Sequence, residues 1–85
     1  MENWYVYICI SKANHYYVGI SPNPKLRLKK HNTGNGAKMS TDQGGFTLIY
    51  TSKPFKDKSA AMEREIQIKG WTRAKKEKLI SGEWE

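Results

Sequence analysis

The first twenty residues carry the clearest pattern of hydrophobic positions in the chain. Residues 4–10 form an unbroken aromatic and aliphatic run, which is long enough for a strand and too short for a typical helix. A second such run covers residues 16–20, after a short polar loop at residues 12–14. Asn14 tolerates the left-handed conformation that a three-residue hairpin loop requires. The pattern therefore predicts a β-hairpin at the start of the chain.

The expected hairpin register gathers tyrosines on one face of the sheet. With this loop, Cys9 faces Tyr17 on the second strand. Tyr7 faces Gly19, and a glycine there leaves room for another group to approach the backbone. Because tyrosine favours strands in general, strand propensity alone is the simpler explanation for these residues. Side chains alternate along strands, so one face carries Tyr5, Tyr7 and Tyr17, and the other carries Trp4, Val6, Ile8, Ile10, Tyr16, Val18 and Ile20.

A helix, a long loop and a third strand follow the hairpin. The helix is predicted over residues 24–32, because Asn23 can cap it and Pro24 suits its first position. Residues 33–45 form a loop rich in glycine and small polar residues, and loops of this length are often functional. Apolar residues alternate over residues 46–52, which predicts a strand that joins the sheet of the hairpin.

Two more helices complete the predicted fold. Asp57 or Ser59 caps the first of them, which runs to about Gly70. Thr72 caps a short last helix over residues 73–80. The elements follow the order β-β-α-β-α-α, which is typical of a small α+β domain.

The charge of the chain changes this picture more than its size does. A length of 85 residues favours one domain over residues 1–85. Fifteen Lys and Arg against eight Asp and Glu give a net charge of +7, which favours a nucleic-acid partner. An anionic membrane surface is disfavoured, because no segment combines a basic face with a broad apolar one.

Other classes of protein are excluded by what the sequence lacks. It has no long apolar run and no signal-peptide pattern, so no membrane span is expected. Its single cysteine, Cys9, lies within the first strand and is expected to be a small buried hydrophobe. An internal disulfide is therefore impossible, and zinc-ligand spacing is missing. We expect a cytoplasmic protein without structural zinc.

One carboxylate lies on the apolar side of the second predicted helix. Glu65 falls inside the arc formed by Ala61, Met62, Ile66 and Ile68 when residues are placed at about 100° each. Acidic residues are rarely buried unless they are paired or bound to a metal ion. Two interpretations stay open from the residues alone, an ion pair with a basic residue and a metal ligand.

Basic and polar residues elsewhere in the sequence add to these candidates. Arg27 and His31 lie four residues apart, and therefore on one face of the first predicted helix. A solvated basic surface without a site would show the same charges, but Arg27 and His31 border the apolar stripe. The expected nucleic-acid contacts are Lys29, Lys30, Lys38, Ser40 and Lys69.

Together these residues suit the hydrolysis of a phosphodiester bond. The reaction needs a water nucleophile, a proton acceptor and positive charge against the phosphate in the transition state. One carboxylate, Glu65, can hold a Mg²⁺ or Mn²⁺ ion that keeps most of its waters. Arg27 can bind phosphate oxygens, and a nearby cation can lower the pKa of a tyrosine.

The ordered set of residues resembles the GIY-YIG nuclease superfamily, and its small stand-alone bacterial members in particular. Residues 5–7 (YVY) match the first motif and residues 17–19 (YVG) match the second. The Arg27–His31 pair, residues 36–38 (GAK) and Glu65 followed by residues 68–71 (IKGW) also match. The resemblance implies a three-stranded antiparallel sheet flanked by helices, and one-metal cleavage of phosphodiesters.

The same resemblance implies a role for each candidate residue. Tyr7 and Tyr17 would position or deprotonate the water. Arg27 would stabilise the transition state, and His31 would support proton transfer or phosphate binding. Glu65 would hold Mg²⁺ or Mn²⁺. We therefore expect a metal-dependent DNA endonuclease that acts on single-stranded or branched DNA and is connected with DNA repair or recombination.

Some positions depart from the family pattern. Tyr5 and Val6 replace its first glycine and isoleucine, and Ile20 and Ser21 stand where many members have a lysine or histidine. Larger relatives add a DNA-binding domain that this sequence lacks, so its own basic surface or a protein partner would select the target. The alternative function is a nucleic-acid-binding module with a vestigial site, or a subunit that works with RNA or another protein.

Overall fold

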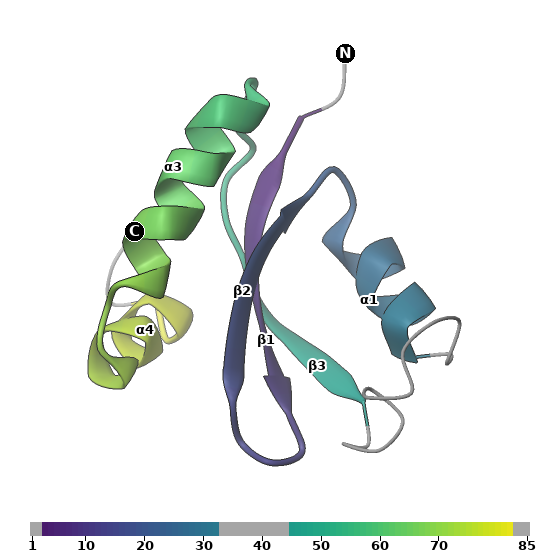
Figure 1. The fold of residues 1–85 in the computed structure, drawn as a ribbon, viewed down its shortest axis with the longest axis vertical. Coiled ribbons are helices and arrows are strands. Elements are labelled where there is room, and N and C mark those ends of the chain that lie inside the picture. The colour runs from purple at the N-terminus through teal and green to yellow at the C-terminus, as the bar shows by residue number, and fades with distance from the viewer. Residues whose placement is uncertain (1–2, 33–44, 83–85) are drawn as a thin grey trace.

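A computed structural model describes residues 3–32 and 45–82 of the chain. The elements are β1 (Tyr5–Ser11), β2 (Tyr16–Ser21), α1 (Pro24–Asn32), β3 (Phe46–Thr51), α3 (Lys58–Lys69) and α4 (Arg73–Ile80). The three strands form one antiparallel sheet in the order β2-β1-β3. In Figure 1, α1 covers one side of this sheet, and α3 and α4 cover the other. The predicted α+β class and the order of the elements are confirmed.

The hairpin of β1 and β2 closes as its sequence predicts. Asn14 has a φ of 69°, the left-handed conformation that the three-residue loop requires. The Ser11 N–H donates to the carbonyl oxygen of His15 at 3.0 Å and so closes the loop. The resulting register pairs Cys9 with Tyr17 and Tyr7 with Gly19.

The third strand departs from the simple alternation that its sequence predicts. Ile8 of β1 faces Tyr50, but the next residue, Cys9, faces Leu48. Ile49 is therefore an extra residue in β3, and it forms a β-bulge there. Alternation alone would place Leu48 and Tyr50 on the same face, whereas the bulge turns Tyr50 toward the opposite face. Ile49 and Tyr50 both pack against the core.

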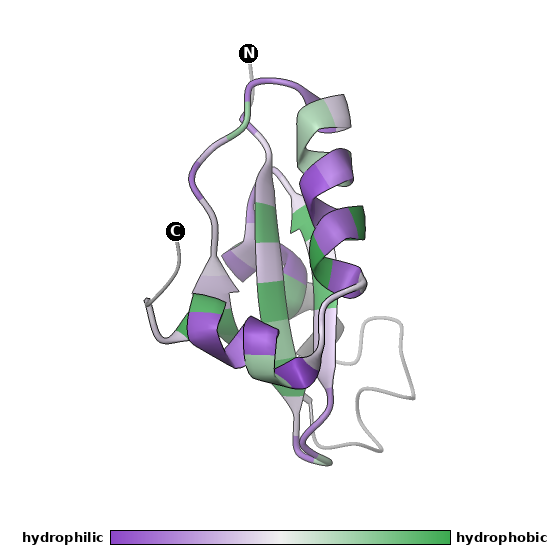
Figure 2. Cartoon of the chain, turned by 90° about the vertical axis from the view of Figure 1, so that its left-hand side faces the viewer, coloured by the Kyte–Doolittle hydropathy of each residue, from purple (hydrophilic) through white to green (hydrophobic). Residues whose placement is uncertain are grey.

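The hydrophobic core lies between the sheet and the layer of α3 and α4. Val6 and Ile8 of β1 are fully buried, as the alternation along the strand predicts. Figure 2 shows α3 and α4 in front of the sheet, with hydrophobic strand positions behind them. Among residues 3–32 and 45–82, the buried cluster is Val6, Ile8, Ala61, Ile68 and Leu79.

The apolar arc predicted on α3 is wider than the face that the helix buries. Ala61 and Ile68 are fully buried, and the Glu65 side chain between them is 16% exposed. Met62 and Ile66, which the sequence pattern places on the buried side, are 42% and 65% exposed. The reason is that α3 packs through one narrow stripe, spaced four and three residues apart, on β1 and β2.

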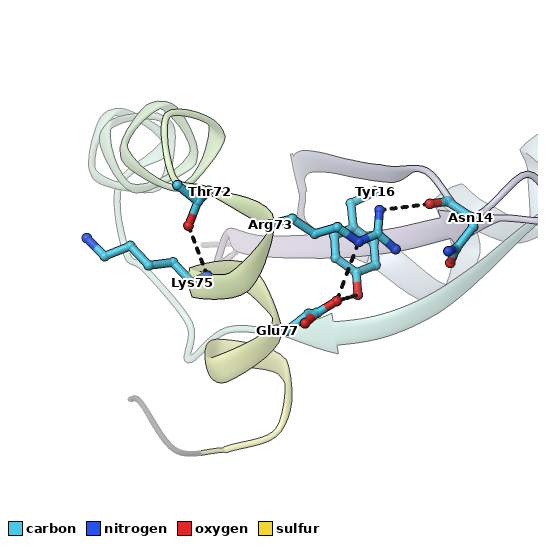
Figure 3. A network of polar contacts seen from close by, with 6 residues as sticks. All are labelled: Asn14, Tyr16, Thr72, Arg73, Lys75 and Glu77. Carbon is cyan, nitrogen blue, oxygen red and sulfur yellow. Dashed lines mark hydrogen bonds and ion pairs between the residues drawn. The ribbon is translucent and has the colours of Figure 1, made fainter.

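A network that the sequence did not predict ties α4 to the hairpin loop (Figure 3). The Arg73 guanidinium lies over the Tyr16 ring at 4.1 Å and donates from Nη1 to the carbonyl oxygen of Asn14 at 2.9 Å. Its Nε also lies 3.4 Å from the Glu77 carboxylate, which accepts a hydrogen bond from the Tyr16 hydroxyl. The Thr72 cap begins the helix, as predicted, by accepting from the Lys75 N–H at 3.2 Å.

Candidate active site

Tyr7 lies at the centre of the candidate site, because its ring crosses the neighbouring strand at Gly19. A Cβ atom added to Gly19 would lie 2.7 Å from the Tyr7 hydroxyl oxygen and 2.8 Å from the adjoining ring carbon. No side chain fits in that space. The group that approaches the backbone at this glycine is thus Tyr7 itself, and Gly19 allows the phenol to lie across β2.

Arg27 reaches the Tyr7 phenol from α1. The helix begins with the predicted cap, in which Asn23 Oδ1 accepts from the Leu26 N–H at 3.2 Å. Leu28 turns inward and is 8% exposed, while Arg27 stays exposed at the surface. A side-chain hydrogen bond joins Arg27 to Tyr7, and the two residues also interact through charge. The predicted proximity of an arginine and a strand tyrosine is therefore present.

Glu65 acts on the same phenol from α3. Its carboxylate is close enough to Tyr7 for its negative charge to raise the pKa of the phenol. The side chain also forms an ion pair with Lys69, with 3.4 Å between Oε2 and Nζ. The lysine partner anticipated from the sequence is thus present, but the Lys69 side chain is 57% exposed and such pairs contribute little to stability.

The balance at Tyr7 favours a neutral phenol. Burial of the ring raises the pKa of Tyr7 above its ordinary value of 10.0, and this is the largest effect. The charge of Arg27 and its hydrogen bond lower the pKa again, while the charges of Cys9 and Glu65 add to the increase. The sequence predicts that a nearby cation lowers this pKa; Arg27 does lower it, but burial of the ring has the larger effect.

Tyr17 lies on the predicted face of β2, diagonally across from Tyr7. It is 42% exposed, and its ring packs edge-on against Phe46 of β3, with 5.0 Å between ring centroids and an interplanar angle of 85°. Since Tyr17 and Phe46 come from the two outer strands, this contact spans the full width of the sheet. It fixes the Tyr17 ring above β1.

The predicted nucleic-acid contacts are only partly within the described residues. Lys29 is exposed on α1, and Lys69 is exposed next to Glu65. The side chains of Lys30 and His31 lie outside the part of the chain that the structure describes, as do Lys38 and Ser40.

The carboxylate of Glu65 fits an ion held mainly through water. Over residues 3–32 and 45–82, no group of three His, Cys, Asp or Glu residues is arranged to hold a metal ion. A fully protein-coordinated ion such as structural zinc does not fit these residues. Mg²⁺ accepts a site with one carboxylate, because it keeps several of its own waters.

Gly19 is not among the site residues predicted from the sequence, although a signal was available. The predicted register already placed it opposite Tyr7, and glycine in a strand often marks a close approach. The signal did not say which group would approach. Only the rotamer of Tyr7, which the structure provides, identifies that group.

Comparison with known proteins gives one consistent result. The family model described as the GIY-YIG catalytic domain matches residues 3–78. A UPF0213 protein of Cronobacter sakazakii is 36% identical over 98% of this chain and 86% of its own length. A second one, from Natronomonas pharaonis, is 39% identical over 93% of this chain and 92% of its own length.

Two solved structures have the same fold. One is the solution structure of the UPF0213 protein BH0048 from Bacillus halodurans, whose sequence is 40% identical to this one. The two structures match with a TM-score of 0.58 over 93% of this chain and 83% of the BH0048 chain. The protein EF2693 from E. faecalis is 28% identical, with a TM-score of 0.63, and covers 95% of this chain and 85% of its own. Within residues 3–32 and 45–82, no helix has the length and apolar character that a membrane crossing requires.

Proposed function

The chain belongs to the GIY-YIG family, and from this premise we propose that it is a divalent-metal-dependent endonuclease that hydrolyses DNA phosphodiester bonds. One observation carries the proposal. The Tyr7 phenol is hydrogen-bonded to Arg27 and lies within the field of Glu65, so three elements direct their functional groups to one place. We also propose that residues 1–85 form one catalytic domain.

Arg27 supplies positive charge for the phosphate in this proposal. A guanidinium offers two parallel N–H donors, which match two oxygens of a phosphate. Its side chain is close enough to the Tyr7 phenol to lower the pKa of that group. Donors fixed in advance contribute most where negative charge develops in the transition state.

Glu65 is the proposed metal ligand. Its carboxylate would hold a Mg²⁺ or Mn²⁺ ion, which would supply Lewis-acid chemistry at this place. The Lys69 ammonium, which the carboxylate pairs with in the absence of an ion, is exposed and free to turn toward solvent or a phosphate. This gives Lys69 a second role as a nucleic-acid contact.

Tyr7 acts as a neutral hydrogen-bond partner in this mechanism. A phenol with a raised pKa remains protonated at neutral pH, so it orients the attacking water or a phosphate oxygen. Tyr17, on the same face, would line the path of the substrate. The proton of the water would pass to His31 or to solvent.

DNA with an unpaired or branched region is the proposed substrate. The net charge of +7 supports binding to a polyanion. The second candidate, a binding module without activity, is favoured by the Glu65–Lys69 ion pair, which satisfies the carboxylate without any metal ion.

A cleavage assay separates the two candidates. End-labelled single-stranded, duplex and branched DNA are incubated with Mg²⁺ or Mn²⁺, using the wild type and the Glu65→Gln and Arg27→Gln variants. We expect metal-dependent cutting of at least one substrate, lost in both variants. Salt-sensitive binding of all substrates without any cutting would support the binding module instead.

A further inference from the structure

A cleft next to the candidate active site has the size and chemistry of a nucleotide subsite. It has a volume of about 400 Å³, within the range of small-molecule pockets. Its walls come from the start of β1, the end of β3 and the turn before α1. The lining residues are Tyr5, Pro22, Asn23, Pro24, Lys25 and Thr51.

The cleft lies beside Tyr7 on the same face of the sheet. Thr51 pairs with Tyr7 across β1 and β3, so their side chains leave the same face of the sheet. Tyr5 is two residues before Tyr7 and also shares this face, about 6.6 Å away along the strand. Gly19 pairs with Tyr7 on its other side. A DNA strand that enters from the side of Glu65 and binds across Tyr7 therefore reaches this cleft next.

The lining groups divide into a charged part and a flat apolar part. Lys25 is exposed, and none of the carboxylates on the described residues forms an ion pair with it. Thr51 adds a hydroxyl group beside it. The Tyr5 ring and Pro22 are half-buried and offer apolar surface. An ammonium next to an aromatic ring is the combination that binds a phosphate together with a sugar or base.

The helix end itself is not the source of this binding. Asn23 already accepts from the Leu26 N–H, which satisfies one of the free donors at the start of α1. The positive charge of the cleft comes instead from Lys25, two residues before Arg27. The two basic side chains leave the helix at different angles, so Lys25 serves a phosphate other than the one beside Arg27.

We propose that this cleft binds the nucleotide next to the cleaved phosphodiester. Lys25 and Thr51 bind its phosphate, and the Tyr5 ring packs against its sugar and base. The inference rests on the proposed nuclease function and extends it, because it names residues that set the substrate register without taking part in the bond cleavage. Substitutions of these residues should change KM and leave kcat nearly unchanged.

The test measures the affinity of the metal-free protein for a short fluorescent single-stranded DNA, by anisotropy in EDTA. We expect Lys25→Gln to weaken binding severalfold and to reduce the salt slope by about one. Tyr5→Leu should weaken binding by about tenfold, the usual scale for loss of an aromatic platform, and Tyr5→Phe should retain the affinity. Lys12→Gln, on the exposed hairpin loop at the other end of β1, is the matched charge control.

A second measurement locates the ligand without any variant. Thymidine 5′-monophosphate is titrated into the isotope-labelled protein, and we expect amide NMR shifts at Tyr5, Asn23, Lys25 and Thr51. Lys25→Gln and Tyr5→Leu proteins that bind like the wild type, together with shifts elsewhere, would overturn the subsite while cleavage by the wild type still stood. A wild type that neither binds nor cuts DNA would overturn the proposed function, and the subsite with it.

Discussion

The two faces of the sheet differ in what their side chains do. Toward α3 and α4, Val6 and Ile8 are completely buried in the core. Toward α1, the same strand presents Tyr7, which is half-buried, hydrogen-bonded to Arg27 and open to a substrate. Alternation along one strand thus separates residues that stabilise the fold from residues available for chemistry.

Two residues connect these faces. Gly19 has no side chain, which lets the Tyr7 phenol extend over β2 toward its edge. Glu65 belongs to α3, on the packed side, yet its charge acts on Tyr7. The candidate site therefore lies at the edge of β2, where the two faces meet, and substitutions on each face should produce different kinds of defect.

The largest effect is expected at Glu65. In Glu65→Gln, we predict that cleavage falls by about 10³-fold, because the charge that holds the ion is lost. The free energy of unfolding should change by only a few tenths of a kcal/mol, because the ion pair lies within one helix and its Lys69 side chain is 57% exposed. Single-turnover cleavage and urea unfolding of the same samples measure both.

Glu63→Gln is the control for this prediction. Glu63 lies on the same helix but is exposed, beside Phe55, Arg64 and Gln67. Its variant should keep wild-type activity. Equal losses in the two variants would mean that the net charge of α3, and not a metal ligand, supports cleavage.

The packed face is tested by a pair of isoleucines on α3. Ile68 is fully buried and Ile66 is 65% exposed. Ile68→Ala should lower the free energy of unfolding by about 2–5 kcal/mol, the usual cost of a core truncation, while the activity of each folded molecule is retained. Ile66→Ala should change stability by less than about 0.5 kcal/mol. Similar losses in both would show that Ile66 is covered in solution.

A smaller effect is expected at Gly19, where the two faces meet. The Cβ of Gly19→Ala collides with the Tyr7 phenol and displaces it. We predict a loss of cleavage of up to about 10²-fold, since a displacement of 1 Å at a reacting group can cost that much. Gly70→Ala is the control, because its Cβ would meet nothing closer than 3.6 Å and its φ is −82°. Undiminished cleavage by Gly19→Ala would contradict the placement of Tyr7.

The smallest effect concerns pH. Burial raises the pKa of the Cys9 thiol from 9.0 to about 11. The thiol therefore ionises at a lower pH in the unfolded chain than in the folded one. Its contribution to the free energy of unfolding is complete below pH 9 and is lost as the pH rises toward 11. Urea unfolding over this range should show a smaller loss of stability in Cys9→Ala than in the wild type. The Tyr7 phenol adds a loss in the same direction at higher pH in both proteins.

Much of the fold follows from local rules in the sequence. The hairpin register follows from Asn14, because one residue in the left-handed conformation fixes the loop length. The start of α1 follows from Asn23 and Pro24 in the same way. The bulge at Ile49 could not be predicted, because it depends on how β3 meets β1 and not on the sequence of β3 alone.

The residues of the candidate site could be predicted from the sequence, but the relative strengths of the interactions among them could not. The arc of α3 placed Glu65 on the inner side, although Met62 and Ile66 were assigned wrongly to that side. A helical projection shows which residues form the apolar side of a helix. It does not show how wide the surface is that packs against that side. The raised pKa of Tyr7 depends on burial by residues distant in sequence, which no local pattern contains.

The central claim is that Glu65, Tyr7 and Arg27 form one metal-dependent site at the edge of β2. The most direct test is paramagnetic broadening of amide NMR signals by Mn²⁺, which requires no substrate. We predict that the signals of Glu65, Tyr7 and Gly19 broaden together in the wild type and remain sharp in Glu65→Gln. Broadening that is centred elsewhere, or that persists in Glu65→Gln, would contradict the claim.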